Sequence, residues 1–188
     1  YDYSAEQREY ACYITTGNLL VYEYYGDVGG NNITTFTSDS AIVSGADVGA
    51  WSHIAFSIDV SAKTTALWKN GVTRSATKSE TGVGATSIAN GTAKLLIGAY
   101  NSTAPAAYLD GKVGMVRIFN DIRTEAEFIA DQTAYTVTDA NMIGEWKLNN
   151  DLLDTSGNAN TLTAVNTPVF VEDSPFVYPT NKSTAYFM

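Results

Sequence analysis

The sequence predicts an all-β fold, an antiparallel β-sandwich or jelly roll with one short helix near residues 124–132. Short strand-like runs recur along the whole chain, separated by clusters of Gly, Asn, Asp and Ser, as is typical of sandwiches and barrels. The 12 Tyr and many Thr residues favour half-buried, pleated surfaces. Strands and helices do not alternate, so a parallel sheet is not supported.

Each element is predicted from a local pattern. Ile54, Phe56 and Ile58 alternate with more polar residues, which is the period of a strand with one buried face. Asn70-Gly71 predicts a tight hairpin, because both residues tolerate a positive φ. Thr124-Glu125-Ala126-Glu127 is a capping box, and it predicts a helix of about two turns that ends near Gln132. The expected strands are 10–15, 19–24, 33–37, 51–58, 64–69, 72–78, 94–100, 111–119, 143–148, 161–165, 169–171 and 184–188. The expected loops and connectors are 16–18, 27–32, 79–92, 101–105 and 135–141.

Bulk composition limits the function. The 188 residues suit one large all-β domain, and 45% hydrophobic residues are enough for a core. The net charge of −9 and the scattered basic residues argue against a nucleic-acid partner. The longest apolar runs are shorter than the roughly 18 residues of a membrane span. The chain begins at Tyr1 and not at Met, so we expect a processed product, a fragment, or the ordered part of a longer protein.

The single cysteine, Cys12, excludes an internal disulfide. It lies in an apolar, strand-like run, and we expect it to be a small buried hydrophobic residue. A nucleophilic cysteine needs a histidine partner, and His53 is the only histidine. We favour a structural place in a strand for His53 over a catalytic one.

Four motifs in order resemble those of laminin-G-like, concanavalin A-like domains. Residues 51–56 and 66–71 resemble the hairpin W-x-H-V/I-A … Y/W-x-N-G. Residues 96–99 resemble the strand L-x-I-G, and 111–120 resemble the strand that contains R-I/V-Y/F-N. Residues 124–129 resemble the short helix that closes such domains. The resemblance covers about residues 5–132 and implies a concanavalin A-like jelly roll.

A second resemblance lies in the tail. Gly144-Glu145-Trp146-Lys147-Leu148, followed by Asp154-Thr155-Ser156-Gly157-Asn158, resembles the opening of the same kind of domain, W-x-L … D-x-S-G-N. An opening signature thus stands at the end of the chain, and the stretch that should lead from it into Tyr10 is missing. We therefore expect 1–138 to be the main body of a sandwich and 139–188 to be opening strands. These strands complete the same domain, a neighbouring subunit or a following repeat.

The resemblance implies a non-catalytic protein. Related glucan hydrolases carry their catalytic carboxylates in a Glu-x-Asp-x-x-Glu strand, and this motif is absent. Glu125 and Glu127 belong to a helix start, and Glu145 stands alone on its strand. We expect no enzymatic activity.

Similar domains can hold a structural calcium ion in the D-x-S-G-N turn. Asp154, Ser156 and Asn158 occupy alternate positions of this turn, and Asp110 is a further candidate ligand. Hard oxygen donors of this kind suit calcium. The alternative is a β-turn that needs no metal.

Carbohydrate binding is the usual role of the fold. Tyr22, Tyr24, Tyr25, Tyr100 and Tyr108 are candidates for stacking on a glycan, although most are expected to be packing residues. Asn-x-Ser/Thr triplets begin at Asn32, Asn90, Asn101 and Asn181. Our first hypothesis is a structural or adhesive module of a cell-surface protein, extracellular filament or virion tail, which forms a homo-oligomer or polymer. The alternatives are a discrete glycan-binding lectin module and, less favoured, a glycoside hydrolase.

Overall fold

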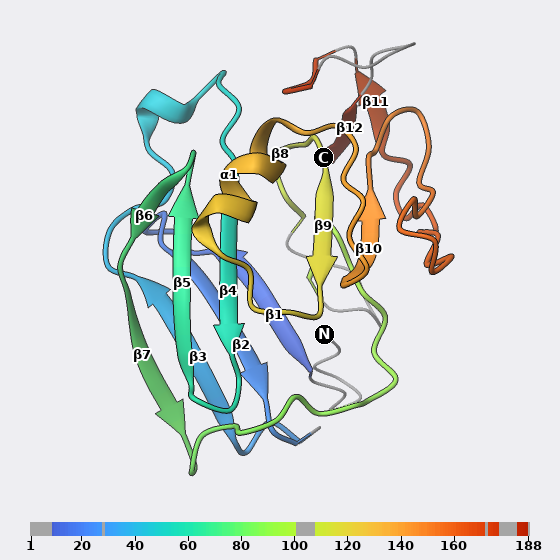
Figure 1. Ribbon diagram of the computed structural model, residues 1–188. Coiled ribbons are helices and arrows are strands. Elements are labelled where there is room, and N and C mark those ends of the chain that lie inside the picture. Colours follow the sequence, from blue (N-terminus) through green and yellow to red (C-terminus); the bar gives the residue numbers. More distant parts are fainter. Residues whose placement is uncertain (1–8, 28, 101–107, 172, 177–183, 188) are drawn as a thin grey trace. The chain divides into compact units, whose positions relative to one another are not determined.

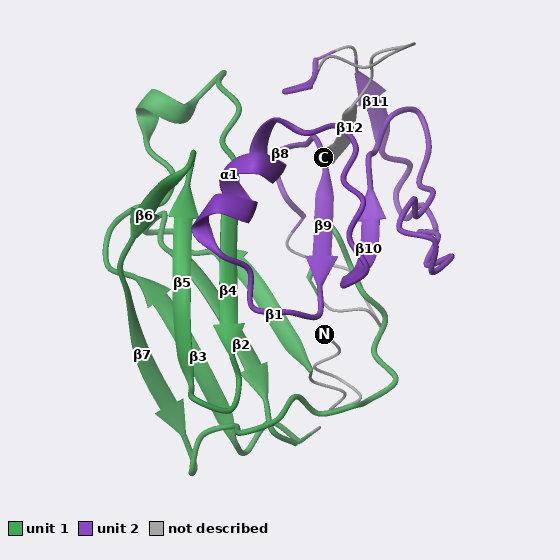
Figure 2. Cartoon of the chain, viewed as in Figure 1, with its two compact units in different colours: residues 1–107 green, residues 108–188 purple. Residues whose placement is uncertain are grey.

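The computed structural model describes residues 9–187 except 28, 101–107, 172 and 177–183 (Figure 1). The chain divides into two compact units, residues 1–107 and 108–188 (Figure 2). All strand pairs of the described residues are antiparallel, and one short α-helix accompanies them. The predicted all-β class is confirmed.

The first unit is a sandwich of two antiparallel sheets. One sheet has the strand order β1-β2-β3-β7, and the other has the order β4-β5-β6. The strands are β1 (Tyr10–Ile14), β2 (Leu20–Tyr25), β3 (Ile33–Ser38), β4 (Ile54–Asp59), β5 (Thr64–Lys69), β6 (Val72–Arg74) and β7 (Ala76–Thr81). A 3-10 turn, Gly45–Asp47, precedes β4. Six of the predicted strands are recognisable here in whole or in part, namely 10–15, 19–24, 33–37, 51–58, 64–69 and 72–78.

The core of this unit is aromatic and lies between the two sheets. The ring of Tyr22 stacks on Phe56 at 4.4 Å and on Phe36 at 5.5 Å, measured between ring centroids. The Tyr22 hydroxyl lies 2.9 Å from Thr65 Oγ1, and the Tyr24 hydroxyl donates to the carbonyl of Val60 at 3.2 Å. Each buried tyrosine therefore has a partner for its polar end, which burial requires.

The Asn70-Gly71 hairpin is confirmed, since φ is 53° at Asn70 and 74° at Gly71. The single strand predicted for 72–78 is wrong, because the chain changes sheets at Ser75. β6 pairs with β5 before this residue, and β7 pairs with β3 after it. β7 also continues to Thr81, so the loop predicted to begin at 79 begins later. Pairing across the sandwich decides both outcomes, and local pattern carries no information about it.

The second unit contains two small sheets and the helix. One sheet has the order β11-β12-β8, and the other pairs β10 with β9. The elements are β8 (Gly111–Val113), β9 (Val116–Phe119), α1 (Glu125–Thr133), β10 (Met142–Trp146), β11 (Val169–Val171) and β12 (Thr184–Phe187). The capping box is present, with the backbone N–H of Thr124 donating to Glu127 Oε2 at 2.7 Å. The strand of the opening signature, β10, thus pairs with β9 of the same chain.

Three more of the predicted strands are wrong in whole or in part. Residues 94–100 are irregular, because Gly98 adopts a φ of 77° that interrupts an extended chain. Residues 161–165 are also irregular, and a positive φ at Asn166 turns the chain directly after them. The strand predicted for 111–119 is divided between β8 and β9. The loop predicted for 101–105 lies outside the described residues.

Candidate functional site

Strand β1 lies at the edge of its sheet. Among the described strands it pairs only with β2, in a register that places Cys12 opposite Tyr22. Tyr10 and Ile14 are 41% and 40% exposed, and Cys12 is exposed. Full burial of Cys12 was predicted and is not found, although the groups packed around its thiol still desolvate it and raise its pKa to about 12. Its side chain lies on the core face of the sheet, but at an edge strand the opposite sheet does not cover that face.

The backbone of β1 presents half of its hydrogen-bonding groups outward. The N–H of Thr15 donates to Leu19, and the N–H of Tyr25 donates to Glu9, at 2.9 and 2.8 Å. In an antiparallel ladder, bonded pairs alternate with non-bonded pairs. Residues 9, 11, 13 and 15 therefore bond to β2, and the backbone groups of Tyr10, Cys12 and Ile14 point away from it. An edge of this kind is a template for another strand.

A shallow hollow of about 390 Å³ opens beside the same strand. It is lined by Tyr13, Ile14, Glu23 and Tyr100. The Glu23 carboxylate accepts hydrogen bonds from the Tyr25 hydroxyl at 2.5 Å and from Thr35 Oγ1 at 3.3 Å. Two aromatic rings and a carboxylate are groups that bind sugars by stacking and by hydrogen bonds.

The structure separates the tyrosines that the sequence singled out. Tyr22, Tyr24 and Tyr25 are 0%, 0% and 3% exposed, so they are packing residues. Tyr100 and Tyr108 are 38% and 36% exposed, in the first and second unit respectively. Tyr13, which is 40% exposed, was missed. Alternation along β1 could have suggested it, but only the edge position of the strand exposes it.

The D-x-S-G-N turn is held by hydrogen bonds to one carboxylate. Asp154 Oδ1 accepts the backbone N–H of Glu145 at 3.0 Å and of Ser156 at 2.9 Å, and Oδ2 accepts that of Asn160 at 2.8 Å. Burial opposes ionisation of Asp154, but these backbone donors outweigh it and lower its pKa to about 2. The side-chain amide of Asn158 donates to the carbonyl of Met142 at 3.1 Å.

The predicted calcium ligands take part in hydrogen bonds of the turn, and a calcium ion bound there stays a prediction. A cation needs several oxygens that converge on it, whereas the Asp154 oxygens face three N–H groups and Asn158 presents its NH₂ group. Asp110 is exposed and lies just before β8. Among the described residues, no group of three neighbouring carboxylates includes Asp110 or Asp154.

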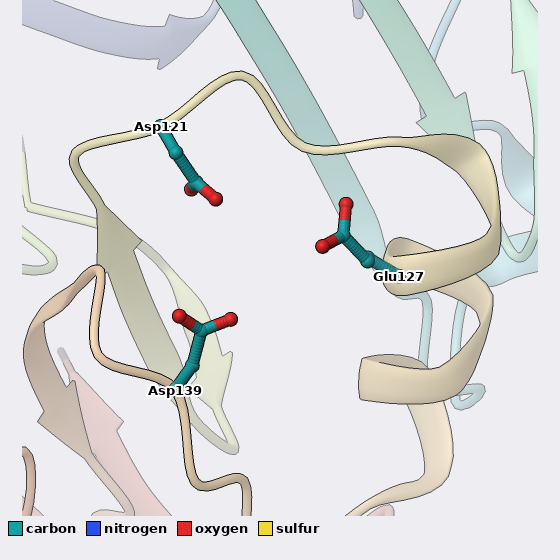
Figure 3. A group of neighbouring side chains, drawn as sticks. All are labelled: Asp121, Glu127 and Asp139. Carbon is teal, nitrogen blue, oxygen red and sulfur yellow. The ribbon is translucent and has the colours of Figure 1, made fainter.

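Three other carboxylates do gather, those of Asp121, Glu127 and Asp139 (Figure 3). The guanidinium of Arg123 forms ion pairs with all three. Its Nη1 contacts Asp139 and lies 3.8 Å from Asp121 and 3.6 Å from Glu127. The backbone N–H of Asn141 and the Arg123 guanidinium together lower the pKa of Asp139. Arg123 is 6% exposed and also bonds to Asp131 at 2.7 Å. The cluster is an anchor for the helix, and the sequence analysis missed Arg123.

Glu145 is the single carboxylate on β10, as expected, and the structure places it in a buried ion pair. Its side chain is 2% exposed and accepts a hydrogen bond from Arg117 Nε at 2.9 Å. Thr155 Oγ1 also donates to it, and Lys147 Nζ lies 3.4 Å away. The Glu145 carboxylate is thus engaged in a buried ion pair with Arg117. The backbone N–H and C=O of His53 bond to Asn70 at the hairpin, one residue before β4 begins, and the structural role of its side chain stays a prediction.

The Asn-x-Ser/Thr triplets differ in access. The Asn32 amide donates to Asp27 Oδ2 at 2.9 Å, and Thr34 of the same triplet is 0% exposed. Asn90 is exposed in an irregular segment. Asn101 and Asn181 lie outside the described residues. Of the two described triplets, only that of Asn90 is accessible to a modifying enzyme.

Comparison with known proteins gives one match. A family model described as the concanavalin A-like lectin/glucanases superfamily, of the laminin G type, matches residues 3–128. No curated protein and no solved structure matches the chain significantly. No helix in the described residues has the length and apolarity to cross a membrane.

Proposed function

Because the chain belongs to the concanavalin A-like lectin/glucanase superfamily, we propose that it is a non-catalytic adhesive module of an extracellular assembly, and that its edge strand β1 binds a strand of a partner. The observation that carries the proposal is the outward-facing backbone of β1, flanked by exposed Tyr10 and Ile14. Backbone pairing supplies affinity in such strand addition, and side chains supply selectivity.

The roles of the described carboxylates support the non-catalytic part. Glu127 caps the helix, Asp154 holds a turn and Glu145 pairs with Arg117. Each has its oxygens engaged by structural donors, and the two carboxylates beside Glu127, those of Asp121 and Asp139, share the Arg123 guanidinium with it. The acid of a glycosidase has a raised pKa, whereas the pKa values of Glu127 and Asp154 are lowered. We expect no release of reducing sugar from β-glucans or other glycans.

Light scattering over a range of chain concentrations tests the proposal. The wild-type chain is expected to associate, and Ile14→Lys is expected to weaken association, because a charge on an edge strand blocks pairing. Val48→Lys is the matched control, since Val48 is 83% exposed and belongs to the turn that precedes β4, not to β1. A chain that stays monomeric at every concentration would refute the assembly role.

The hollow beside β1 favours a second candidate, glycan binding. Tyr13 and Tyr100 bring exposed rings to it, and Glu23 brings a carboxylate. A glycan array with the wild-type chain and with Tyr13→Ala tests this. Binding that is lost in Tyr13→Ala, but kept in Val48→Lys, would establish the hollow as a lectin site.

A further inference from the structure

We propose that the strand which pairs with β1 is β1 of a second copy, antiparallel and related by a two-fold axis that passes through Cys12. The inference rests on the proposed function, since it names the partner that the edge binds. It also specifies a closed dimer, because a two-fold contact uses the same surface on both chains and does not propagate.

The residues of β1 whose backbone groups point outward are placed suitably for pairing with a second copy of β1. Its outward backbone groups belong to Tyr10, Cys12 and Ile14, which are spaced symmetrically about the middle of the five-residue strand. Two antiparallel copies that overlap fully place Cys12 opposite the partner's Cys12 and Tyr10 opposite the partner's Ile14. In this register the outward backbone groups of Tyr10, Cys12 and Ile14 face those of the partner's Ile14, Cys12 and Tyr10, so each of these three pairs exchanges two hydrogen bonds.

The side chains beside these backbone groups are complementary in the same register. Tyr10 and Ile14 are among the exposed large hydrophobic residues. Pairing about Cys12 brings the ring of Tyr10 beside the β-branched side chain of the partner's Ile14, and the symmetry repeats this contact. Aromatic and β-branched cross-strand pairs stabilise sheets. The same pairing covers apolar surface that the described part of the chain leaves exposed.

Charge selects this edge for contact between two copies. The chain has a net charge of −9, so two copies repel one another except where a surface is uncharged. Residues 10–14 carry no charged side chain, and the Glu9 carboxylate before them accepts the N–H of Gly91 at 2.8 Å. The other outer strand of this sheet, β7, carries Lys78 and Glu80. Charges of this kind protect an edge from pairing.

A charge-swap experiment tests the axis. At Cys12 a side chain faces its own copy, so Cys12→Lys and Cys12→Asp are each expected to raise the dimer dissociation constant about tenfold or more. An equimolar mixture of the two variants is expected to recover dimers, because each lysine then faces an aspartate. Cys12→Ser is the neutral control and is expected to associate as the wild type does. Analytical ultracentrifugation measures the wild type, the three variants and the mixture, and thermal melting checks that each chain is folded.

Cross-linking gives a second measurement that needs no charged variant. Because the pKa of the Cys12 thiol is raised to about 12, its reaction with a maleimide is slow and needs a prolonged incubation. A short bismaleimide is then expected to join two wild-type chains through Cys12, since opposed Cα atoms lie about 5.5 Å apart in a hydrogen-bonded pair. The control Cys12→Ser/Ser79→Cys moves the thiol to exposed β7 and is expected to stay unlinked.

The outcomes separate the two proposals. Two outcomes would overturn the two-fold pairing and leave the assembly role standing. In the first, both charged variants still associate as the wild type does. In the second, both variants associate more weakly, and mixing them does not restore association. Chains that remain monomeric throughout would overturn both. Recovery in the mixture together with a Cys12 cross-link supports the dimer.

Discussion

Replacing Glu145 by alanine is expected to destabilise the second unit by about 3 kcal/mol. The side chains of Glu145 and Arg117 are 2% and 8% exposed, and the Nε–Oε1 distance between them is 2.9 Å. Removing one partner of a buried pair leaves the other charge without compensation, which costs about 3–5 kcal/mol. The lower end applies here, because the other two guanidinium nitrogens still donate to the carbonyls of Asp131 and Ala134, at 3.0 and 2.6 Å.

Hydrogen exchange of peptides from β9 and β10 measures this loss locally, so the first unit does not mask it. Lys112–Asp173 is the matched control pair, with side chains that are 36% and 55% exposed. Asp173→Ala is expected to cost less than about 1 kcal/mol, as exposed pairs do. If Glu145→Ala cost no more than Asp173→Ala, the pair would not be buried and the reasoning would be refuted.

Three further predictions concern single residues. Asp154 has a lowered pKa of about 2, so its contribution to stability is present above pH 4, roughly the ordinary pKa of Asp, and is lost as the pH falls towards about 2. Urea melts at several pH values should show this loss, and in Asp154→Asn the stability should no longer change over this pH range. The stability of Asp154→Asn should also be the same with calcium and with a chelator. Gly82→Ala is expected to cost at least about 1 kcal/mol more than Gly49→Ala, because both have a positive φ but only at Gly82 would a Cβ lie 2.4 Å from the carbonyl of Asn31; equal melting temperatures would contradict this. Thr124→Ala is expected to cost about 1 kcal/mol by loss of the helix cap, and unchanged exchange protection of α1 would speak against it.

Elements that depend on neighbouring residues were predictable. The Asn70-Gly71 hairpin and the capping box at Thr124 each follow from backbone preferences and from bonds within four residues. The candidate sites were less predictable, since each depends on where distant donors lie. The Asp154 turn was located correctly along the chain. Its chemistry could not be inferred, because the hydrogen bond from the backbone N–H of Glu145 joins the turn to another strand.

The sequence by itself determined the all-β class, the alternation of buried and exposed side chains within strands, and the family. These depend on side-chain periodicity and on motifs along the chain. Tertiary structure alone decided which strands lie at an edge. Cys12 was expected to be buried by its apolar neighbours, yet it is exposed, because β1 has a described partner strand on one side only. Burial is a property of what covers a strand, and the covering strands come from distant parts of the chain.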